Sequence, residues 1–308
     1  MKERSARTFY HSIEEMISAC FGAGVHLLKM ECVPGGDINQ AYRVTLSSGN
    51  SIFVKTNAIH NVHFFLAEAN GLEALRSAEK IGVPKILGVG TDKKREVSFL
   101  AMEYIKSSQK TGNYWETFGY ELANLHRACS SSFVTLREPG GKFGFAEDNY
   151  IGASPQKNDP KEKWVDFYRE CRLLPQLTMA ERYLPSAIRK KAQRLLEHLE
   201  DYMREPEFPS LLHGDLWSGN ILCGDNEKAW IIDPAVYVGD CETDLAMLQL
   251  FGRIPESFWE GYRGIIPIDL KEYGERRPLY DLYHLLNHLN LFGYGYLGEV
   301  VDIIKHYG

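Results

Sequence analysis

The first hundred residues alternate between helical and strand-like patterns of apolar and polar positions. Apolar side chains recur at helical spacing over residues 12–21 and 62–79. Turn-forming residues at 47–50 join two strand-like runs into a hairpin. The strand-like runs are 27–33, 41–46, 51–56, 85–90 and 97–104. The pattern predicts a small antiparallel sheet with one helix inserted between its strands.

From about residue 107 the chain is mainly helical. The helical patterns cover residues 113–128, 162–178, 186–203 and 240–306. A loop rich in Gly, Asn and Pro at 137–160 interrupts them, and two short apolar runs end at Asp233. We predict an α+β, protein-kinase-like fold with a sheet lobe at 1–105 and a larger, mainly helical lobe at 106–308. Polar residues gather where the two predicted lobes meet, and this arrangement favours a cleft between the lobes.

Composition and charge narrow the possible partners. The 308 residues include 35 Lys and Arg against 41 Asp and Glu, a net charge of −6. Because no basic run is longer than three residues, we expect no nucleic-acid partner. No apolar run reaches the roughly 18 residues of a membrane span. The first nine residues lack the apolar segment of a secretory signal.

The six cysteines are scattered and include no C-x-x-C pair. This spacing argues against a zinc site or a dithiol redox motif. We therefore expect free thiols in a reducing compartment and a cytoplasmic protein.

The strongest chemical signal is H-G-D-L-W-S-G-N at residues 213–220, followed by Asp233 after an apolar run. Phosphoryl transfer needs a carboxylate that accepts the proton of the attacking hydroxyl, and metal ligands that bridge the phosphates. Asp215 and Asn220 have the interval of a kinase base and metal ligand. We predict that Asp215 is the base and that Asn220 and Asp233 hold Mg²⁺. The alternative is an ordinary turn, with Asp233 capping a helix.

The sheet lobe supplies candidates for ATP binding. Lys55 lies within a strand after two apolar residues, as does the phosphate-binding lysine of kinases. Its predicted ion-pair partner on the following helix is Glu68, with Glu73 as an alternative. Gly35 and Gly36 lie in a loop between strands that could cover the phosphates, although the loop lacks the G-x-G-x-x-G pattern. The adenine is expected at the end of the last strand, against Met102, Glu103, Tyr104 and Ile105.

Several stretches resemble known kinases. H-G-D-x-x-x-x-N is similar to the motif of aminoglycoside phosphotransferase-like kinases, which share a protein-kinase-like fold. The narrower matches are G-G-D-I-N at 35–39, D-N-Y-I-G-A-S-P-Q at 148–156, D-P-A-V-Y-V-G-D-C-E-T-D-L-A-M at 233–247 and Y-D-L-Y-H-L-L-N-H-L-N-L-F-G at 280–293. Together they resemble the fructosamine-3-kinase / ketosamine-3-kinase family over residues 9–305.

The resemblance implies ATP-dependent phosphorylation of the 3-hydroxyl of ketosamines, the sugar adducts that glycation leaves on protein lysines. The phosphorylated adduct decomposes, so the activity would repair glycated proteins. Family tendency favours ribulosamine over fructosamine as the acceptor. We expect the sugar to contact Trp217, Asn149, Tyr150, Gln156 and His288. Trp217 and His288 have a simpler interpretation as core residues.

Two further residues are expected to support the catalytic loop. His213 opens the motif, and Asp244 is expected to hydrogen-bond the loop or to cap the helix that begins nearby.

Two other functions remain open: a small-metabolite, aminoglycoside or choline-type kinase, and a non-catalytic kinase-like binding module. A cationic acceptor would need acidic residues around it, and Asp240, Glu242 and Asp244 already belong to the family motif. A binding module would have lost catalytic residues that this chain retains.

Cys32 is a candidate redox control point. It lies on the strand that enters the Gly35–Gly36 loop, and we expect this strand to be at the edge of the sheet. A monomer or a homodimer fits the sequence. In a symmetric dimer Cys32 could form a disulfide with the same residue of the second chain. The alternative is a buried, inert thiol.

Overall fold

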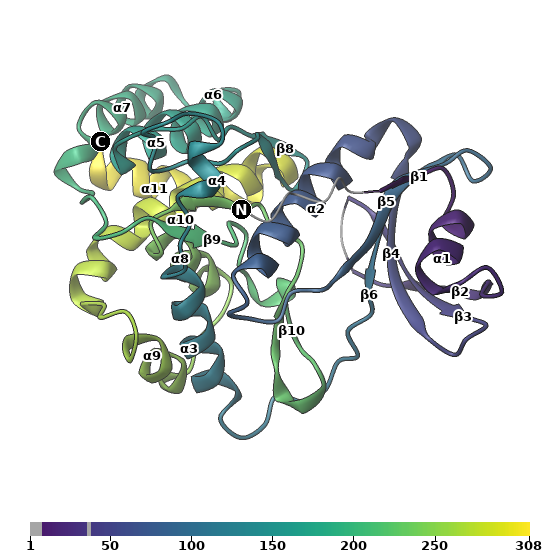
Figure 1. The fold of residues 1–308 in the computed structure, drawn as a ribbon. Helices are drawn as coiled ribbons and strands as arrows, with labels where there is room; N and C mark the ends of the chain where they lie inside the picture. The colour runs from purple at the N-terminus through teal and green to yellow at the C-terminus, as the bar shows by residue number, and fades with distance from the viewer. Residues whose placement is uncertain (1–7, 36–37) are drawn as a thin grey trace.

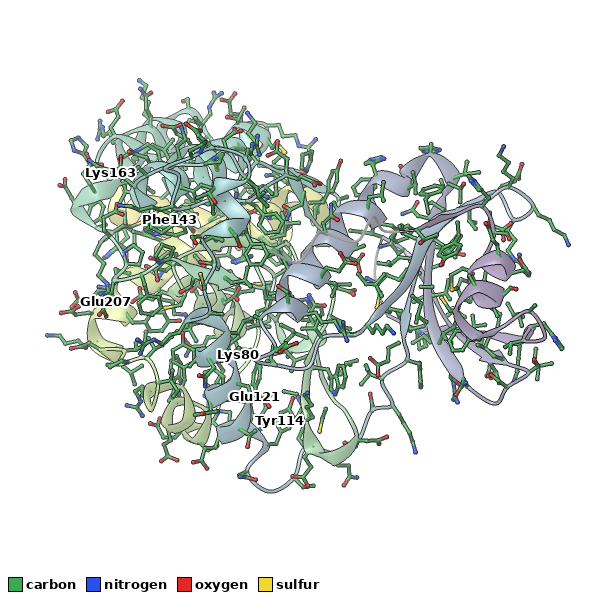
Figure 2. All side chains as sticks on the ribbon, viewed as in Figure 1. Lys80, Tyr114, Glu121, Phe143, Lys163 and Glu207 are labelled. Atoms are coloured by element: carbon green, nitrogen blue, oxygen red, sulfur yellow. The ribbon has the colours of Figure 1, made fainter. Side chains whose placement is uncertain are left out.

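The computed structural model describes residues 8–35 and 38–308. A sheet lobe and a larger helical lobe lie side by side, with α2 (Val62–Ser77) between them (Figure 1). This is the predicted α+β arrangement. Figure 2 shows side chains that end in nitrogen or oxygen atoms around the outside of both lobes. Among the described residues, no helix combines the length and apolar character that crossing a membrane requires.

The sheet lobe is a six-stranded sheet in the order β1-β5-β6-β4-β3-β2. Helix α2 follows β4 in the chain and leads to β5, as predicted. The strands are β1 (Phe9–Tyr10), β2 (Leu27–Val33), β3 (Gln40–Leu46), β4 (Ser51–Ala58), β5 (Ile86–Asp92) and β6 (Val97–Glu103).

The prediction of a purely antiparallel sheet is wrong at β1, which pairs with β5 in parallel. A two-residue strand is too short to show an alternating pattern. Two glycines of β5 make room for it: a Cβ at Gly90 would lie 1.9 Å from the Tyr10 carbonyl oxygen, and one at Gly88 would lie 2.7 Å from the Tyr10 ring. Helix α1 (Ile13–Phe21) follows β1. Its apolar residues form a separate small core with β3, β4 and β6.

The helical lobe begins after β6. The long loop predicted at 137–160 contains a short hairpin, and the helix predicted at 162–178 is broken by a π-helical turn, η2. Its elements are α3 (Tyr114–His126), α4 (Ser132–Thr135), β7 (Asn149–Ile151), β8 (Ser154–Gln156), α5 (Trp164–Tyr168), η2 (Arg169–Leu173), α6 (Leu174–Ala180), α7 (Ser186–Glu197), η3 (Leu199–Asp201), β9 (Ser210–Leu212), η4 (Ser218–Asn220), β10 (Ile221–Cys223), η5 (Asp225–Glu227), β11 (Ala229–Ile231), β12 (Tyr237–Gly239), α8 (Glu242–Leu250), α9 (Glu256–Arg263), α10 (Leu270–Phe292), η6 (Tyr294–Tyr296) and α11 (Leu297–Tyr307).

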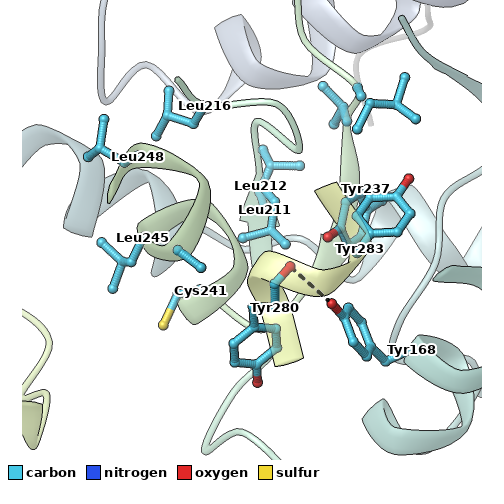
Figure 3. Close-up of a cluster of buried hydrophobic side chains, with 14 of the residues drawn as sticks. Tyr168, Leu211, Leu212, Leu216, Tyr237, Cys241, Leu245, Leu248, Tyr280 and Tyr283 are labelled. Carbon is cyan, nitrogen blue, oxygen red and sulfur yellow. Dashed lines mark hydrogen bonds between the residues drawn. The ribbon is translucent and has the colours of Figure 1, made fainter. Parts of the chain in front are cut away.

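A large apolar core supports the segment that carries the catalytic motif. Leu211 and Leu212 of β9 and Leu216 beyond it are fully buried, among Leu245 of α8 and Tyr280 of α10 (Figure 3). Helix α2 belongs to the same core, although it lies in the first hundred residues. A Cβ at Gly71 would lie only 2.9 Å from the Val236 side chain, so α2 packs tightly on the chain just after Asp233. Such close packing holds the loops that follow β9 and Asp233 in place.

Candidate active site

A cavity of about 890 Å³ lies where the two lobes meet. Its lining includes Lys55 and Glu68 from the sheet lobe, and Asp215, Asn220 and Asp233 from the helical lobe. The structure therefore brings together residues that lie up to 178 positions apart in the sequence.

Lys55 of β4 is held between two carboxylates. Its Nζ lies 2.7 Å from Oε1 of Glu68 on α2 and 2.5 Å from Oδ1 of Asp233. Burial alone would lower the pKa of Lys55, but Asp233 and Glu68 raise it overall, so the ammonium stays charged. Glu73, the alternative partner, is on the exposed side of α2.

The backbone before Asp215 is fixed by Asp244 of α8. The Asp244 carboxylate accepts hydrogen bonds from the backbone N–H groups of His213, at 2.7 Å, and Gly214, at 2.8 Å. His126 of α3 lies 3.2 Å from the same carboxylate. Burial would raise the pKa of Asp244, but these hydrogen bonds lower it overall. Asp244 is therefore a charged, fully buried acceptor that positions the loop.

His213 and Gly214 complete this turn. The buried His213 ring donates from Nε2 to the Ile232 carbonyl oxygen at 2.8 Å, which links the loop to the strand leading into Asp233. Gly214 has a φ of +82°, and a Cβ there would lie 2.0 Å from the Ala235 carbonyl oxygen. Only glycine fits this position without displacing the backbone.

Asp215 faces the cavity at the end of the turn. Asn220 donates from Nδ2 to the Asp215 carbonyl oxygen at 2.9 Å and is 3.3 Å from its carboxylate. Burial, reinforced by the charge of Asp233, raises the pKa of Asp215 to about 7. A carboxyl group with this pKa can both accept and release a proton near neutrality.

Asn220 and Asp233 form the candidate Mg²⁺ site. Both line the cavity, and the Asn220 amide lies 3.5 Å from the Asp233 carbonyl oxygen. One carboxylate and one amide supply the oxygen ligands that Mg²⁺ prefers, so this donor set fits the ion. Asp233 has a φ of +56°, a strained conformation for a residue other than glycine, which is typical of functional positions.

The predicted adenine site lies where β6 ends. Met102 is buried, and Met102, Glu103, Tyr104 and Ile105 all line the cavity. The Glu103 carboxylate accepts a hydrogen bond from the Lys85 backbone N–H at 3.2 Å. Gly35 also lines the cavity, with a φ of +115°, whereas Gly36 lies outside the described residues.

Four of the five predicted sugar contacts line the cavity, and three of them lie close to the catalytic motif or in the β7 hairpin. Trp217 is 40% exposed, so its interpretation as a core residue is wrong. Asn149 donates to the Val236 carbonyl oxygen at 2.7 Å and is buried. The Tyr150 ring packs against the Phe64 ring of α2 at a tilt, with ring centroids 4.1 Å apart.

Gln156 lies behind these residues and outside the cavity lining. Its amide donates to Asn149 at 2.7 Å and to the Ala235 carbonyl oxygen at 3.0 Å, and its carbonyl accepts from Tyr283 at 2.6 Å. All its hydrogen-bonding groups are thus engaged with protein. We therefore expect Gln156 to position Asn149 rather than to contact the sugar, contrary to our prediction for this residue.

His288 of α10 lines the cavity and is partly exposed, so it is not a core histidine. The residues around it, Phe251, Phe292 and Tyr296, also line the cavity and were not predicted. The available signal was the spacing of His288 and Phe292, which puts both on one face of a helix.

Two supporting residues were also missed. His126, which contacts Asp244, is the polar residue at the end of the apolar face predicted over 113–128. Arg172 is fully buried, with its guanidinium 3.8 Å from the centre of the Tyr237 ring and a hydrogen bond to Asn158 at 2.8 Å. Asn158 in turn donates to Asn149 at 3.0 Å. A single charged residue inside a helical pattern gives no sign of such burial.

Comparison with known proteins identifies the family. The fructosamine kinase family model matches residues 9–307. The chain belongs to the fructosamine kinase family. It is 37% identical over 301 residues to a probable ketoamine kinase of Synechocystis, covering 96% of both chains. It is 39% identical over 288 residues to the chloroplastic protein-ribulosamine 3-kinase of Arabidopsis thaliana, covering 93% of this chain and 84% of the relative.

Solved structures of the family have the same fold. A putative fructosamine-3-kinase from Thermobifida fusca is 32% identical, with a TM-score of 0.80, over 96% of this chain and 98% of that chain. One from Haemophilus somnus is 27% identical, with a TM-score of 0.82, over 96% of both chains. A spectinomycin phosphotransferase, 18% identical with a TM-score of 0.52 over 96% and 93% of the two chains, shares the fold. These matches confirm the family and the protein-kinase-like fold predicted from the sequence.

Cys32 lies on β2, outside the cavity lining. This strand is at the edge of the sheet, and Cys32 is exposed. The interpretation of Cys32 as a buried thiol is therefore wrong. Its redox role and the disulfide-linked dimer remain predictions.

Proposed function

We propose that this protein is a kinase that transfers the γ-phosphoryl group of ATP to the 3-hydroxyl of ketosamines on protein lysines. The observation that carries the proposal is the arrangement of Lys55, Glu68, Asp215, Asn220 and Asp233 around one cavity in a member of the fructosamine kinase family. The activity would serve the repair of glycated proteins.

In this proposal ATP occupies the sheet-lobe side of the cavity. The adenine lies against Met102 and the backbone of residues 103–105, and Lys55 neutralises the phosphates. Glu68 keeps Lys55 in place through the 2.7 Å ion pair. Asn220 and Asp233 would hold Mg²⁺, which when bound draws charge from the phosphate oxygens.

Asp215 acts on the acceptor. Its carboxylate takes the proton of the 3-hydroxyl as the hydroxyl oxygen bonds to the γ-phosphorus and the bond from that phosphorus to ADP breaks. The hydrogen bonds of Asp244 to the backbone just before Asp215 keep the base in position. Trp217, Asn149 and Tyr150 border the space for the sugar, and Trp217 offers an exposed ring face for stacking.

The competing acceptors fit this cavity less well. Asp240, Glu242 and Asp244 could have supported a cationic antibiotic, but all three are buried. Asp240 accepts a hydrogen bond from Tyr280 at 2.9 Å, and Glu242 pairs with Arg276 at 2.7 Å. These carboxylates therefore interact with other residues of the protein and are not free to bind a cationic acceptor.

The test is a panel of acceptors with ATP and Mg²⁺: ribulosyl-lysine, fructosyl-lysine, choline and kanamycin. We expect turnover of the two ketosamines, with a higher kcat/KM for ribulosyl-lysine. Phosphorus NMR of the product would place the phosphate on the 3-oxygen. Turnover of choline or kanamycin alone would establish a different kinase, and no turnover of any acceptor would support a binding module.

A further inference from the structure

Four aromatic rings gather on the part of the cavity formed by α10 and the segments around its end. The His288 ring is at their centre, and its centroid lies 4.9 Å from that of Phe251, 5.5 Å from Phe292 and 5.1 Å from Tyr296. All four residues line the cavity that also contains Asp215. We call them the aromatic pocket.

The fold assembles this pocket from three segments. His288 and Phe292 are four residues apart on α10, so they lie on the same face. Gly293, with a φ of +87°, ends the helix and lets η6 bring Tyr296 back against His288. Phe251 ends α8. Phe251 is 42% and Phe292 52% exposed, and neighbouring large apolar side chains left open to a cavity indicate a ligand.

His288 offers a hydrogen-bond acceptor in the middle of the rings. Its Nδ1 lies 2.8 Å from the His284 carbonyl oxygen, which can only accept, so Nδ1 carries the proton. Burial lowers the pKa of His288, so the ring is neutral and Nε2 keeps its lone pair. No group in residues 8–35 or 38–308 donates a hydrogen bond to Nε2.

Three of the four carboxylates that line the cavity in the described residues are engaged by other groups of the protein. Glu68 and Asp233 are paired with Lys55, and Glu103 accepts from the Lys85 backbone. Asp215 is the other carboxylate in the lining that the structure describes. A positively charged group at this end would therefore contact ring faces and the His288 lone pair, and Asp215 pairs with no cation of the described residues.

We propose that the aromatic pocket binds the protonated secondary amine of the ketosamine, with the alkyl chain that carries it. The inference rests on the proposed function. In a ketosamine the amine nitrogen is on C1, two carbons from the C3 hydroxyl, so a site for the amine must border Asp215. Ring faces of Phe251, Phe292 and Tyr296 attract the cation. His288 Nε2 accepts one of its N–H groups.

The test compares two acceptors with the same ketose. One is the ketosamine of N-acetyl-lysine, and the other is a 1-O-alkyl ketose, in which an ether oxygen replaces the charged nitrogen. Phe251→Leu and Phe292→Leu keep apolar bulk but remove the ring. Each should raise KM for the ketosamine by about three- to tenfold and leave KM for the ether and for ATP unchanged. An equal rise for both acceptors, or no rise, would overturn the proposal.

Two further variants complete the design. Tyr294→Leu removes a ring that is 70% exposed and outside the cavity lining, so it should change neither KM. His288→Leu should raise KM for the ketosamine alone, and His288→Gln, which retains an acceptor, should restore part of the affinity. A His288→Gln variant no better than His288→Leu would remove the role assigned to Nε2.

A binding measurement separates this proposal from the proposed function. Ligand-observed NMR would follow N-methylbutylammonium and, as the uncharged control, butyl methyl ether. If wild type turns over no ketosamine but binds the ammonium, and Phe292→Leu abolishes that binding, the proposed function fails while the pocket's preference for ammonium stands. If neither compound binds, or both bind equally, the inference fails whatever the kinase activity.

Discussion

The two ends of the cavity are built on different principles. At the phosphate end, charged groups are paired with one another or with the backbone: Lys55 with Glu68 and Asp233, and Asp244 with the turn before Asp215. At the other end, Phe251 and Phe292 are apolar, half-exposed rings. The phosphate end therefore has a fixed geometry, whereas the aromatic end presents exposed ring surfaces that a ligand can contact.

This difference fits the two tasks of a kinase. Transfer needs groups held to a fraction of an ångström, since small displacements of reacting atoms are costly. Binding an alkyl amine needs area and a cation-attracting face, which rings provide with few geometric demands. Changes at the phosphate end should therefore lower kcat or metal use, and changes at the aromatic end should raise KM for the acceptor.

The largest effect is expected from Asp215→Ala. Without the base, kcat should fall by about a hundredfold to ten-thousandfold while ATP binding and folding persist. Steady-state kinetics with a ketosamine and calorimetric titration with ATP would measure both. Asp225→Ala, at an exposed acid of η5, is the control and should behave as wild type. Near-normal kcat in Asp215→Ala would contradict the proposed mechanism.

Asp233→Asn should act mainly through the metal. An amide is a poorer ligand for Mg²⁺ than a carboxylate. We expect the Mg²⁺ concentration for half-maximal rate to rise by about 10- to 100-fold, because even groups that only orient a metal ligand are worth that much. Titration of Mg²⁺ at saturating ATP would measure it, and an unchanged midpoint would exclude Asp233 as a ligand.

Asp244→Asn should affect both stability and turnover. An amide in place of the carboxylate leaves one buried donor without an acceptor, which lowers the free energy of unfolding by about 1–3 kcal/mol. The turn before Asp215 would shift, and kcat should fall by up to about 100-fold. Denaturant unfolding and kinetics would measure the two effects.

Glu242→Gln is the matched control for this prediction. Glu242 is equally buried and pairs with Arg276 at 2.7 Å and Arg204 at 3.1 Å, but within the part of the chain that the structure describes it forms no hydrogen bond to the catalytic turn. Its substitution should lower stability and preserve kcat. If both variants lose kcat alike, Asp244 has no special part in positioning Asp215.

The same contrast explains what the sequence could predict. The phosphate end follows from contiguous motifs, so the placement of Asp215, Asn220 and Asp233 around one cavity could be inferred from spacing. Lys55 and Glu68 needed only a strand followed by a helix. The roles of Phe251 and Tyr296 depend on where α8 and α10 end in space. No local pattern contains that information.

Two features of the strands were equally hard to infer. Gln156 shares a motif with Asn149 and Tyr150, yet Tyr283 and the Ala235 carbonyl oxygen engage its amide. The short strand β1 left no alternating pattern because it has two residues. In each case the deciding contact comes from a residue distant in the chain.

The smallest effect under reducing conditions is expected from Cys32→Ser. Cys32 is exposed on the edge strand β2 and lies outside the cavity lining, so kcat with thiol present should match wild type. Under oxidation by diamide, two Cys32 thiols of separate chains would lose two protons and two electrons and form one disulfide. Because β2 leads into the Gly35 loop, this bond should alter activity.

Non-reducing electrophoresis with parallel assays would detect a dimer that thiol reverses and that Cys32→Ser lacks. Cys129→Ser, at another exposed cysteine, is the control and should dimerise as wild type does. A wild type that stays monomeric under diamide, with unchanged activity, would exclude Cys32 as a redox control point.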